Sequence, residues 1–257
     1  MMNKILFFLV FVSGSLFAQN DEAKVAPSYN KMMIGVSFSP DYAYRTLSSD
    51  GTSVFSNYII ESRNKRETAK LGYTFGLNFN YNFSRKFGLI TGVLYSNKGY
   101  QTESIGNLTF GDQIHSRRGF VILDPNDPAI PNSFKSVYNH YYLDVPLKAI
   151  YRMGKGKIRF ISSVGIITHI LMKSTVKTIS EYQNGEKEKS TRVAYDNYKK
   201  INLSPTISLG VEKQFNNQSL IRVEPTFNYG LLDIIDTPVR AKLWNVGLNV
   251  SYYLRLK

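Results

Sequence analysis

Hydrophobic and polar residues alternate strictly along residues 71–83. Every odd-numbered position there is large and apolar or aromatic, and every even-numbered one is Gly, Thr or Asn. Successive side chains of a β-strand point to opposite faces, so this stretch predicts a strand with one apolar face and one small, polar face. Such a strand fits either a soluble sheet over a dry core or a membrane barrel with lipid outside and a polar lumen.

The same alternation, less regular in places, predicts seven further strands. The eight expected strands are residues 32–42, 71–83, 87–100, 138–152, 157–173, 199–215, 219–231 and 241–256. Pro146 lies within the fourth of them, and this predicts a bulge or kink at that point.

The connections between these strands alternate between long and short. Residues 84–86, 154–156 and 216–218 are short turns, whereas residues 43–70, 101–137, 174–198 and 232–240 are longer polar connections. We expect hairpin tips at Asp50-Gly51 and Asn184-Gly185, and a loop with room for a small hairpin in the proline-containing second connection. Long outer loops and tight inner turns are typical of an up-and-down membrane barrel and not of a Greek-key sandwich.

The first residues have the pattern of an export signal. Lys4 is followed by an apolar run over residues 5–12, and cleavage is expected after Ala18. The predicted organisation is a signal peptide (residues 1–18), a disordered periplasmic leader (residues 19–31) and a barrel domain (residues 32–257). No later stretch approaches the ~18 consecutive apolar residues of a membrane-spanning helix. The expected location is therefore the outer membrane of a Gram-negative cell.

Composition agrees with an exported barrel. The chain has no cysteine, and its 18 Tyr and 16 Phe suffice for two interfacial girdles. The net charge of +13 favours lipid or lipopolysaccharide phosphates over nucleic acid as neighbours, because an exported protein rarely meets nucleic acid and no nucleic-acid motif is present. A simply solvated basic surface is favoured over both.

Two segments are distinctive, YYLDVPLK at residues 141–148 and GVLYSNKG at residues 92–99. Together with the F-A-Q end of the export signal, they resemble the PorT-like outer-membrane β-barrel family of Bacteroidetes. The resemblance implies an eight-stranded antiparallel barrel of the OmpA type, in the broad porin-like class, folded by the barrel assembly machinery. Some relatives take part in secretion or gliding.

Charged residues opposite the apolar faces are the first candidate site. An eight-stranded barrel is just wide enough for its side chains to fill, so these charges should neutralise one another inside a closed lumen rather than form an ion path. They are Asp144, Lys148, Arg152, Arg159, Glu212, Arg222, Glu224 and Arg255.

Catalytic chemistry has weaker support. His115 lies in a loop, and His140 and His169 lie near the loop ends of adjacent strands, but no serine-centred motif accompanies them. No metal-ligand spacing and no cofactor fingerprint occurs either. We therefore expect no enzyme, no cofactor and no metal.

Basic loop residues could contact lipopolysaccharide phosphates, although interleaved glutamates favour plain solvation. They are Arg63, Lys65, Arg66, Arg117, Arg118, Lys187 and Lys189. The expected function is that of a structural or accessory component of an envelope or secretion assembly, acting through its long extracellular loops. The alternatives are a lipid-modifying outer-membrane enzyme and a soluble periplasmic lipid carrier of the calycin type.

Overall fold

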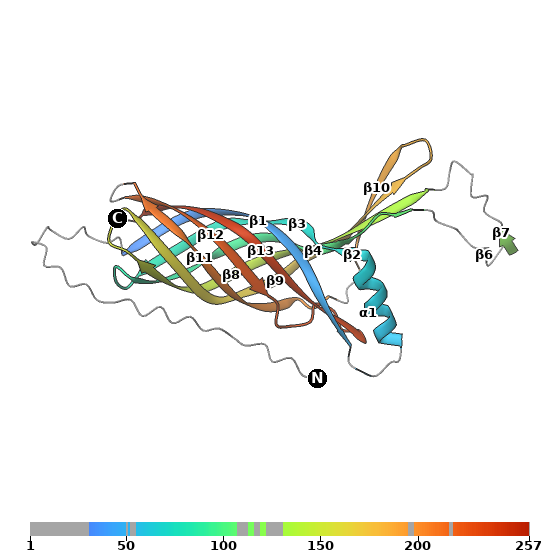
Figure 1. Cartoon of the computed structure of the whole chain (residues 1–257), viewed down its shortest axis with the longest axis horizontal. Coiled ribbons are helices and arrows are strands. Elements are labelled where there is room, and N and C mark those ends of the chain that lie inside the picture. The colour runs from blue at the N-terminus through green and yellow to red at the C-terminus, as the bar shows by residue number, and fades with distance from the viewer. Residues whose placement is uncertain are drawn as a thin grey trace, which may run out of the picture.

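Eight long strands form a closed ring in the computed structural model of the chain (Figure 1). Each pairs antiparallel with its neighbour in the chain, and the last closes onto the first. The strands are β1 (Met32–Ser49), β3 (Lys70–Asn82), β4 (Phe87–Thr102), β8 (Ser133–Met153), β9 (Ile158–Glu181), β11 (Ile201–Gln214), β12 (Ser219–Tyr229) and β13 (Val239–Arg255). The predicted eight-stranded up-and-down barrel is confirmed.

The structure describes residues 31–49, 51, 55–106, 113–115, 119–121, 131–194, 198–215 and 218–256. The predicted signal peptide and all but Lys31 of the predicted leader lie outside these residues, as do Asp50, Arg117 and Arg118. The described residues contain one helix, α1 (Phe55–Arg66), which lacks the length and apolar character to cross a bilayer. The short strands are β2 (Glu67–Thr68), β5 (Ile105–Gly106), β6 (Gln113–His115), β7 (Gly119–Val121) and β10 (Lys187–Val193).

The wall of the barrel is apolar outside and polar inside. On β3, Leu77 is 56% exposed, whereas Asn78 and Asn80 face the lumen at 6% and 0%. On β11, Leu209 is 62% exposed beside the buried Ser208. A soluble protein rarely exposes a continuous apolar surface of this kind, so the outer wall is suited to lipid acyl chains.

Aromatic residues gather on the outer wall at both ends of the strands. At the loop end, Tyr95 stacks on Tyr141 with ring centroids 6.0 Å apart, and Phe75 lies 5.7 Å from Tyr95. At the turn end, Phe87 lies 4.9 Å from Tyr151. Rings at these two levels match the interfacial girdles expected from composition.

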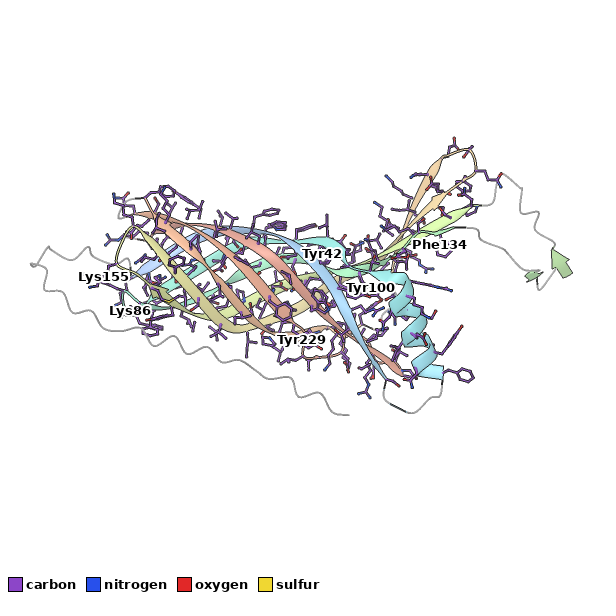
Figure 2. The ribbon with its side chains drawn as sticks, viewed as in Figure 1. Tyr42, Lys86, Tyr100, Phe134, Lys155 and Tyr229 are labelled. Carbon is purple, nitrogen blue, oxygen red and sulfur yellow. The ribbon has the colours of Figure 1, made fainter. Side chains whose placement is uncertain are left out.

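The two ends of the barrel differ in how the chain reverses. At the turn end, Ser84 accepts hydrogen bonds from the backbone N–H groups of Lys86 and Phe87 at 3.2 and 3.0 Å. Gly154 adopts φ 104° in the next turn, a left-handed conformation that favours glycine. Lys86 and Lys155 mark this end in Figure 2, and α1 and Phe134 lie at the opposite, loop end.

The first and third long connections contain more regular structure than expected. β1 continues to Ser49, and α1 begins at Phe55. The prediction that residues 43–70 form a polar loop is therefore wrong. β9 continues to Glu181 and pairs with β10, with the reversal at Asn184-Gly185 as predicted. The loop ends of β8 and β9 (residues 133–139 and 175–181) and β10 make a three-stranded extension beyond the barrel, here called the blade.

Pro146 does not produce the predicted bulge. The register between β8 and β9 shifts at Tyr141/Tyr142, where Met172 is the extra residue, and Pro146 itself pairs regularly with Ile167. On its other side, the pairing with β4 is interrupted between Thr91↔Leu147 and Leu94↔Asp144 without a change of register. Proline lacks the N–H that the ladder needs, so it leaves a gap rather than an extra residue. In the second connection, β6 and β7 form the small hairpin for which the sequence left room.

Candidate functional site

The polar faces of the strands make the barrel interior the main candidate site. Near the turn end, Glu212 of β11 is fully buried and meets three guanidinium groups. Its Oε1 lies 2.9 Å from Arg152 Nε and 2.7 Å from Arg159 Nη2, and its Oε2 lies 3.1 Å from Arg222 Nη2. The Arg222 guanidinium also covers the Tyr253 ring at 4.7 Å. Glu212 therefore ties β8, β9 and β12 to β11 across the lumen.

A second ion pair lies next to this cluster. Lys148 Nζ is 3.2 Å from Glu224 Oε1, and the Asn249 amide donates to the same oxygen at 3.3 Å. Apolar side chains fill the space beside both ion-pair groups in two clusters, Met33 with Leu220 and Tyr253, and Ile90 with Ile150 and Ile161. This end of the barrel is thus closed by packed side chains.

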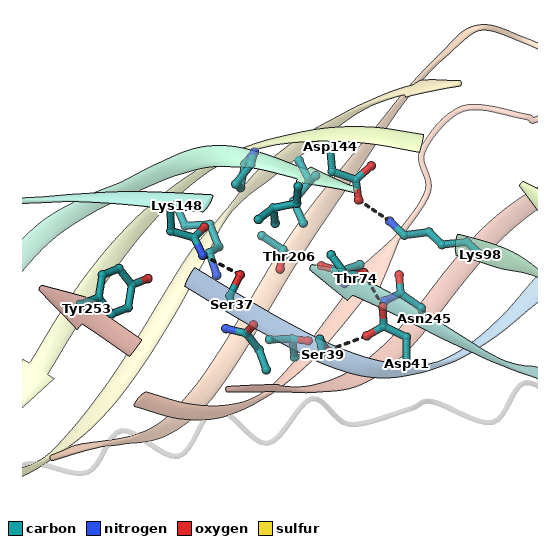
Figure 3. Close-up of a pocket in the computed structure, with 17 residues that line it drawn as sticks. Ser37, Ser39, Asp41, Thr74, Lys98, Asp144, Lys148, Thr206, Asn245 and Tyr253 are labelled. Carbon is teal, nitrogen blue, oxygen red and sulfur yellow. Dashed lines mark hydrogen bonds and ion pairs between the residues drawn. The ribbon is translucent and has the colours of Figure 1, made fainter. Parts of the chain in front are cut away.

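The middle of the lumen holds a chain of hydrogen bonds across three strands. Asp144 Oδ1 lies 2.6 Å from His169 Nδ1, and His169 Nε2 lies 2.8 Å from Ser204 Oγ. Lys98 Nζ lies 3.2 Å from both Asp144 Oδ2 and His169 Nδ1. Figure 3 shows the Lys98–Asp144 contact. Strand register explains the assembly, because β8 pairs Asp144 with His169, and on β11 Ser204 lies diagonally across from His169, two residues beyond its direct partner Asn202.

The order carboxylate, imidazole, hydroxyl is the one that hydrolases use to activate a serine. Here the hydroxyl has no room for a substrate. Ser204 is buried, and the cavity beside it measures about 10 Å³, the space of roughly one water molecule. The Lys98 ammonium also neutralises the carboxylate directly. In this arrangement the three residues satisfy one another as a buried polar network.

A further buried carboxylate lies beside this network. Asp41 of β1 accepts hydrogen bonds from Ser39 at 2.7 Å and from Thr74, both drawn in Figure 3. The cavity around them measures about 50 Å³, and Lys98, Asp144 and Lys148 also line it. Space of this size holds water molecules and not a continuous aqueous channel.

The loop end of the lumen is closed by a tyrosine cluster. Tyr100 and Tyr142 are buried with Ile234, Ala241 and Leu243. Tyr138 stacks on Tyr100 at 4.6 Å, and Tyr198 packs against the same cluster. Ile234 comes from the connection between β12 and β13, so that connection folds back into the mouth of the barrel.

Helix α1 is attached to this mouth through Glu67. Arg45 of β1 and Arg63 of α1 bind opposite oxygens of the Glu67 carboxylate, each at 2.7 Å. Arg45 also donates to Asn64, and Arg63 donates to the Tyr100 hydroxyl at 3.2 Å. Burial lowers the pKa of Arg63, but the hydrogen bond to Glu67 and the nearby Tyr100, Glu67 and Tyr138 groups together outweigh it, so the pKa lies above its ordinary value and the group stays charged.

All the predicted lumenal charges except Arg255 line the interior. Arg255 is exposed at the end of β13, because that strand ends at the rim rather than within the lumen. The predicted lipopolysaccharide contacts are not gathered into one site. Arg63 points to Glu67, whereas Lys65 pairs with Glu61 at 2.7 Å and lines a surface hollow of α1 together with the exposed Arg66. Arg117 and Arg118 lie outside the described residues.

The histidines are divided between different environments. His140 is buried with its Nδ1 2.9 Å from Ser174 Oγ, and His169 belongs to the central network. His115 lies in β6, away from both in the chain. Within the described residues, no group of three His, Asp or Glu side chains could hold a metal ion.

Several residues of the site were missed from the sequence. Lys98 continues the inward face of β4, but that face also carries Ile90 and Leu94, so its polar character was not evident. Ser204 belongs to the polar face predicted for β11, and its diagonal contact with His169, whose direct partner is Asn202, is not evident from the pattern. Arg45 and Glu67 fell in a segment predicted as a loop, and no periodic signal marks them.

The family described as "outer membrane protein beta-barrel domain" matches residues 17–236 of this chain. A search of the curated proteins found no match. Similar solved structures include Neisserial surface protein A, at 10% identity and TM-score 0.43, covering 88% of this chain and 97% of that one. OprG of Pseudomonas aeruginosa matches at 13% identity and TM-score 0.44, covering 89% and 97%. Ail of Yersinia pestis matches at 14% and 0.31, covering 87% and 99%. Likenesses at this level identify neither a ligand nor a partner.

Proposed function

Because the chain belongs to the outer membrane protein beta-barrel domain family, we propose that it is a non-conducting, non-enzymatic component of an envelope assembly. It is an outer-membrane β-barrel protein of a Gram-negative cell. Within this proposal it groups with the PorT-like barrels of Bacteroidetes and serves an envelope or secretion assembly as a structural or accessory part. The barrel anchors the chain, and the loop-end structures contact other components.

The observation that carries the proposal is the filled lumen. Tyrosines close the loop end, the Lys98–Asp144 ion pair lies in the middle, and the Glu212 ion pairs with two apolar clusters fill the turn end. An eight-stranded barrel has little interior space beyond its side chains. A lumen filled with packed side chains is compatible with a membrane anchor, but it leaves no path for diffusion through a pore.

Planar lipid bilayers test the closed lumen. We expect purified full-length protein to show no steady conductance, whereas a porin inserted in the same bilayers conducts. A stable open level that recurs with each insertion would contradict the proposal.

The loop-end structures are the proposed contact surfaces because they contain helix α1 and the paired strands of the blade and lie beyond the lipid-facing wall (Figure 1). Cross-linking in the native envelope, followed by purification, tests their role. We expect a variant in which residues 176–193 are replaced by a two-residue Asn-Gly turn to fold and to lose its cross-linked neighbours. An unchanged set of neighbours would contradict the assignment to the blade.

A lipid-modifying enzyme is the second candidate, favoured by the Asp144–His169–Ser204 hydrogen bonds. The small cavity beside Ser204 makes it the weaker one. Mass analysis of lipid A and phospholipid from cells with and without the protein tests it. We expect identical acyl chains, and a change that disappears in Ser204→Ala would reverse the order of the two candidates. A soluble lipid carrier does not fit a chain of this family with an apolar outer wall.

A further inference from the structure

The blade has two faces that differ in charge. His140 of β8 and Ser174 of β9 are hydrogen-bonded partners in the lumen, so their neighbours Tyr141 and Lys173 point outward. Beyond Tyr141 and Lys173, toward the loop end, the odd-numbered residues of β8 and β9 lie on the same side as the lipid-facing residues of the barrel wall. The outward face of the blade is thus an extension of the surface that meets acyl chains.

Lysines dominate this outward face. Register places Lys135 of β8 and Lys189 of β10 on either side of Ile179 of β9. Neighbouring strands lie about 4.8 Å apart, so the two lysine backbones are roughly 10 Å from each other. Lys177 follows two residues along β9 on the same face, and Lys173 lies at the lower edge, opposite Tyr141 of the loop-end girdle. We call Lys135, Lys173, Lys177 and Lys189 the lysine face.

The charges of the lysine face are not neutralised by the protein. Within the described part of the chain, none of its four lysines forms an ion pair with an acidic side chain. The same face also carries Lys187 and Glu181, which pair with each other at 3.4 Å, so its net charge is that of the four lysines. Unpaired like charges on one small surface repel one another, so the surface is suited to an anionic partner.

The opposite face of the blade provides an internal comparison. According to the strand register, this face carries Phe134, Ser136 and Tyr138 of β8 and Glu188, Ser190 and Arg192 of β10. One acid and one base are mixed there with aromatic and hydroxyl side chains. The same three strands therefore concentrate positive charge only on the side that continues the lipid-facing wall.

We propose that the lysine face binds the phosphate groups of the outer-leaflet glycolipid, the lipid A part of lipopolysaccharide. The lipid is favoured over free phosphate because the surface begins at the aromatic girdle and includes Ile179 for contact with apolar atoms. An ammonium group near an anionic membrane surface strengthens binding roughly fivefold. The inference goes beyond the proposed function and does not depend on a closed lumen.

The test compares two matched triple variants of the full-length protein in a zwitterionic detergent. The first is Lys135→Gln/Lys177→Gln/Lys189→Gln on the lysine face. The control is Lys86→Gln/Lys155→Gln/Lys157→Gln, three exposed lysines at the turn end. Native mass spectrometry measures bound diphosphoryl lipid A, with dephosphorylated lipid A and inorganic phosphate as further probes. Heat-modifiable gel migration verifies that each variant is folded.

We expect the lysine-face variant to bind diphosphoryl lipid A on the order of 100-fold more weakly, from three lysines at roughly fivefold each. The turn-end variant should bind like the unmodified protein, and dephosphorylated lipid A should bind weakly to all three. Equal binding by both variants, or equal binding of dephosphorylated lipid A, would overturn the proposal. Displacement of lipid A by inorganic phosphate at equal concentration would overturn the choice of the lipid.

Discussion

The Glu212 cluster and the lysine face differ in whether their positive charges have acidic partners within the protein. Inside the barrel, three arginines converge on one fully buried carboxylate at 2.7–3.1 Å. On the blade, four lysines share one surface without an acidic partner among the described residues. Buried charge without a partner is strongly unfavourable, whereas exposed charge is solvated or meets an external anion. The first arrangement therefore holds the barrel together, and the second is available to a ligand.

Glu212→Gln should have the largest effect on stability. It leaves the buried Arg152 and Arg222 and the partly buried Arg159 without their carboxylate, and removing one partner of a buried pair costs about 3–5 kcal/mol. Urea unfolding in detergent micelles measures the change in the free energy of unfolding. The exposed Glu61→Gln in α1 is the matched control and should change it by less than about 0.5 kcal/mol. Equal effects of the two substitutions would contradict the role of the cluster.

Lys98 and Asp144 should show strong energetic coupling. We expect each of Lys98→Met and Asp144→Asn to destabilise the barrel by about 2–4 kcal/mol, since each leaves a buried group unpaired. The double variant should be less destabilised than the sum by about 1–3 kcal/mol. Unfolding of all four proteins under the same conditions gives this coupling. Strict additivity would show that the central network is not a unit.

Glu67→Gln should act locally. It removes the charge that joins Arg45 to Arg63, so α1 should detach from the mouth at a cost of about 1–3 kcal/mol. Hydrogen exchange should become faster in residues 55–66 and remain unchanged in β11 and β12. Faster exchange throughout the barrel would mean that Glu67 supports the whole fold.

The triple lysine-face variant should have the smallest effect on stability. Lys189 is exposed and Lys135 and Lys177 are half-buried, and none of the three has an ion-pair partner among the described residues, so the free energy of unfolding should change by less than about 1 kcal/mol. Urea unfolding checks this, and a loss above about 1 kcal/mol would show that these lysines contribute to packing. A small loss of stability with a large loss of lipid A binding would separate the blade from the barrel.

Much of the barrel could be predicted from the sequence, because alternation alone determines which side of a strand is polar. It identified the eight strands, the short turns and most of the lumenal charges, including Glu212 and Arg222. It could not identify α1, whose apolar residues lie mainly in its first turns and define no longer period. It also could not bring Ser204 to His169, since that contact depends on the register between β9 and β11, which are joined by a long connection whose extent of pairing the pattern does not predict. The exposed position of Arg255 depends on where β13 ends, and pattern locates strand ends poorly.

The central feature of the barrel is a wall that is apolar outside and polar inside. The most direct test of this arrangement is the accessibility of spin labels attached to single introduced cysteines, and the chain has no cysteine of its own that would interfere. Labels go at two adjacent pairs, Leu77→Cys with Asn78→Cys and Leu209→Cys with Ser208→Cys, in protein reconstituted into lipid bilayers. We predict that labels at 77 and 209 collide with oxygen dissolved in lipid and are shielded from a water-soluble nickel chelate, and that labels at 78 and 208 collide little with either. Higher collision with the nickel chelate at 77 and 209, or no difference within the pairs, would contradict the account.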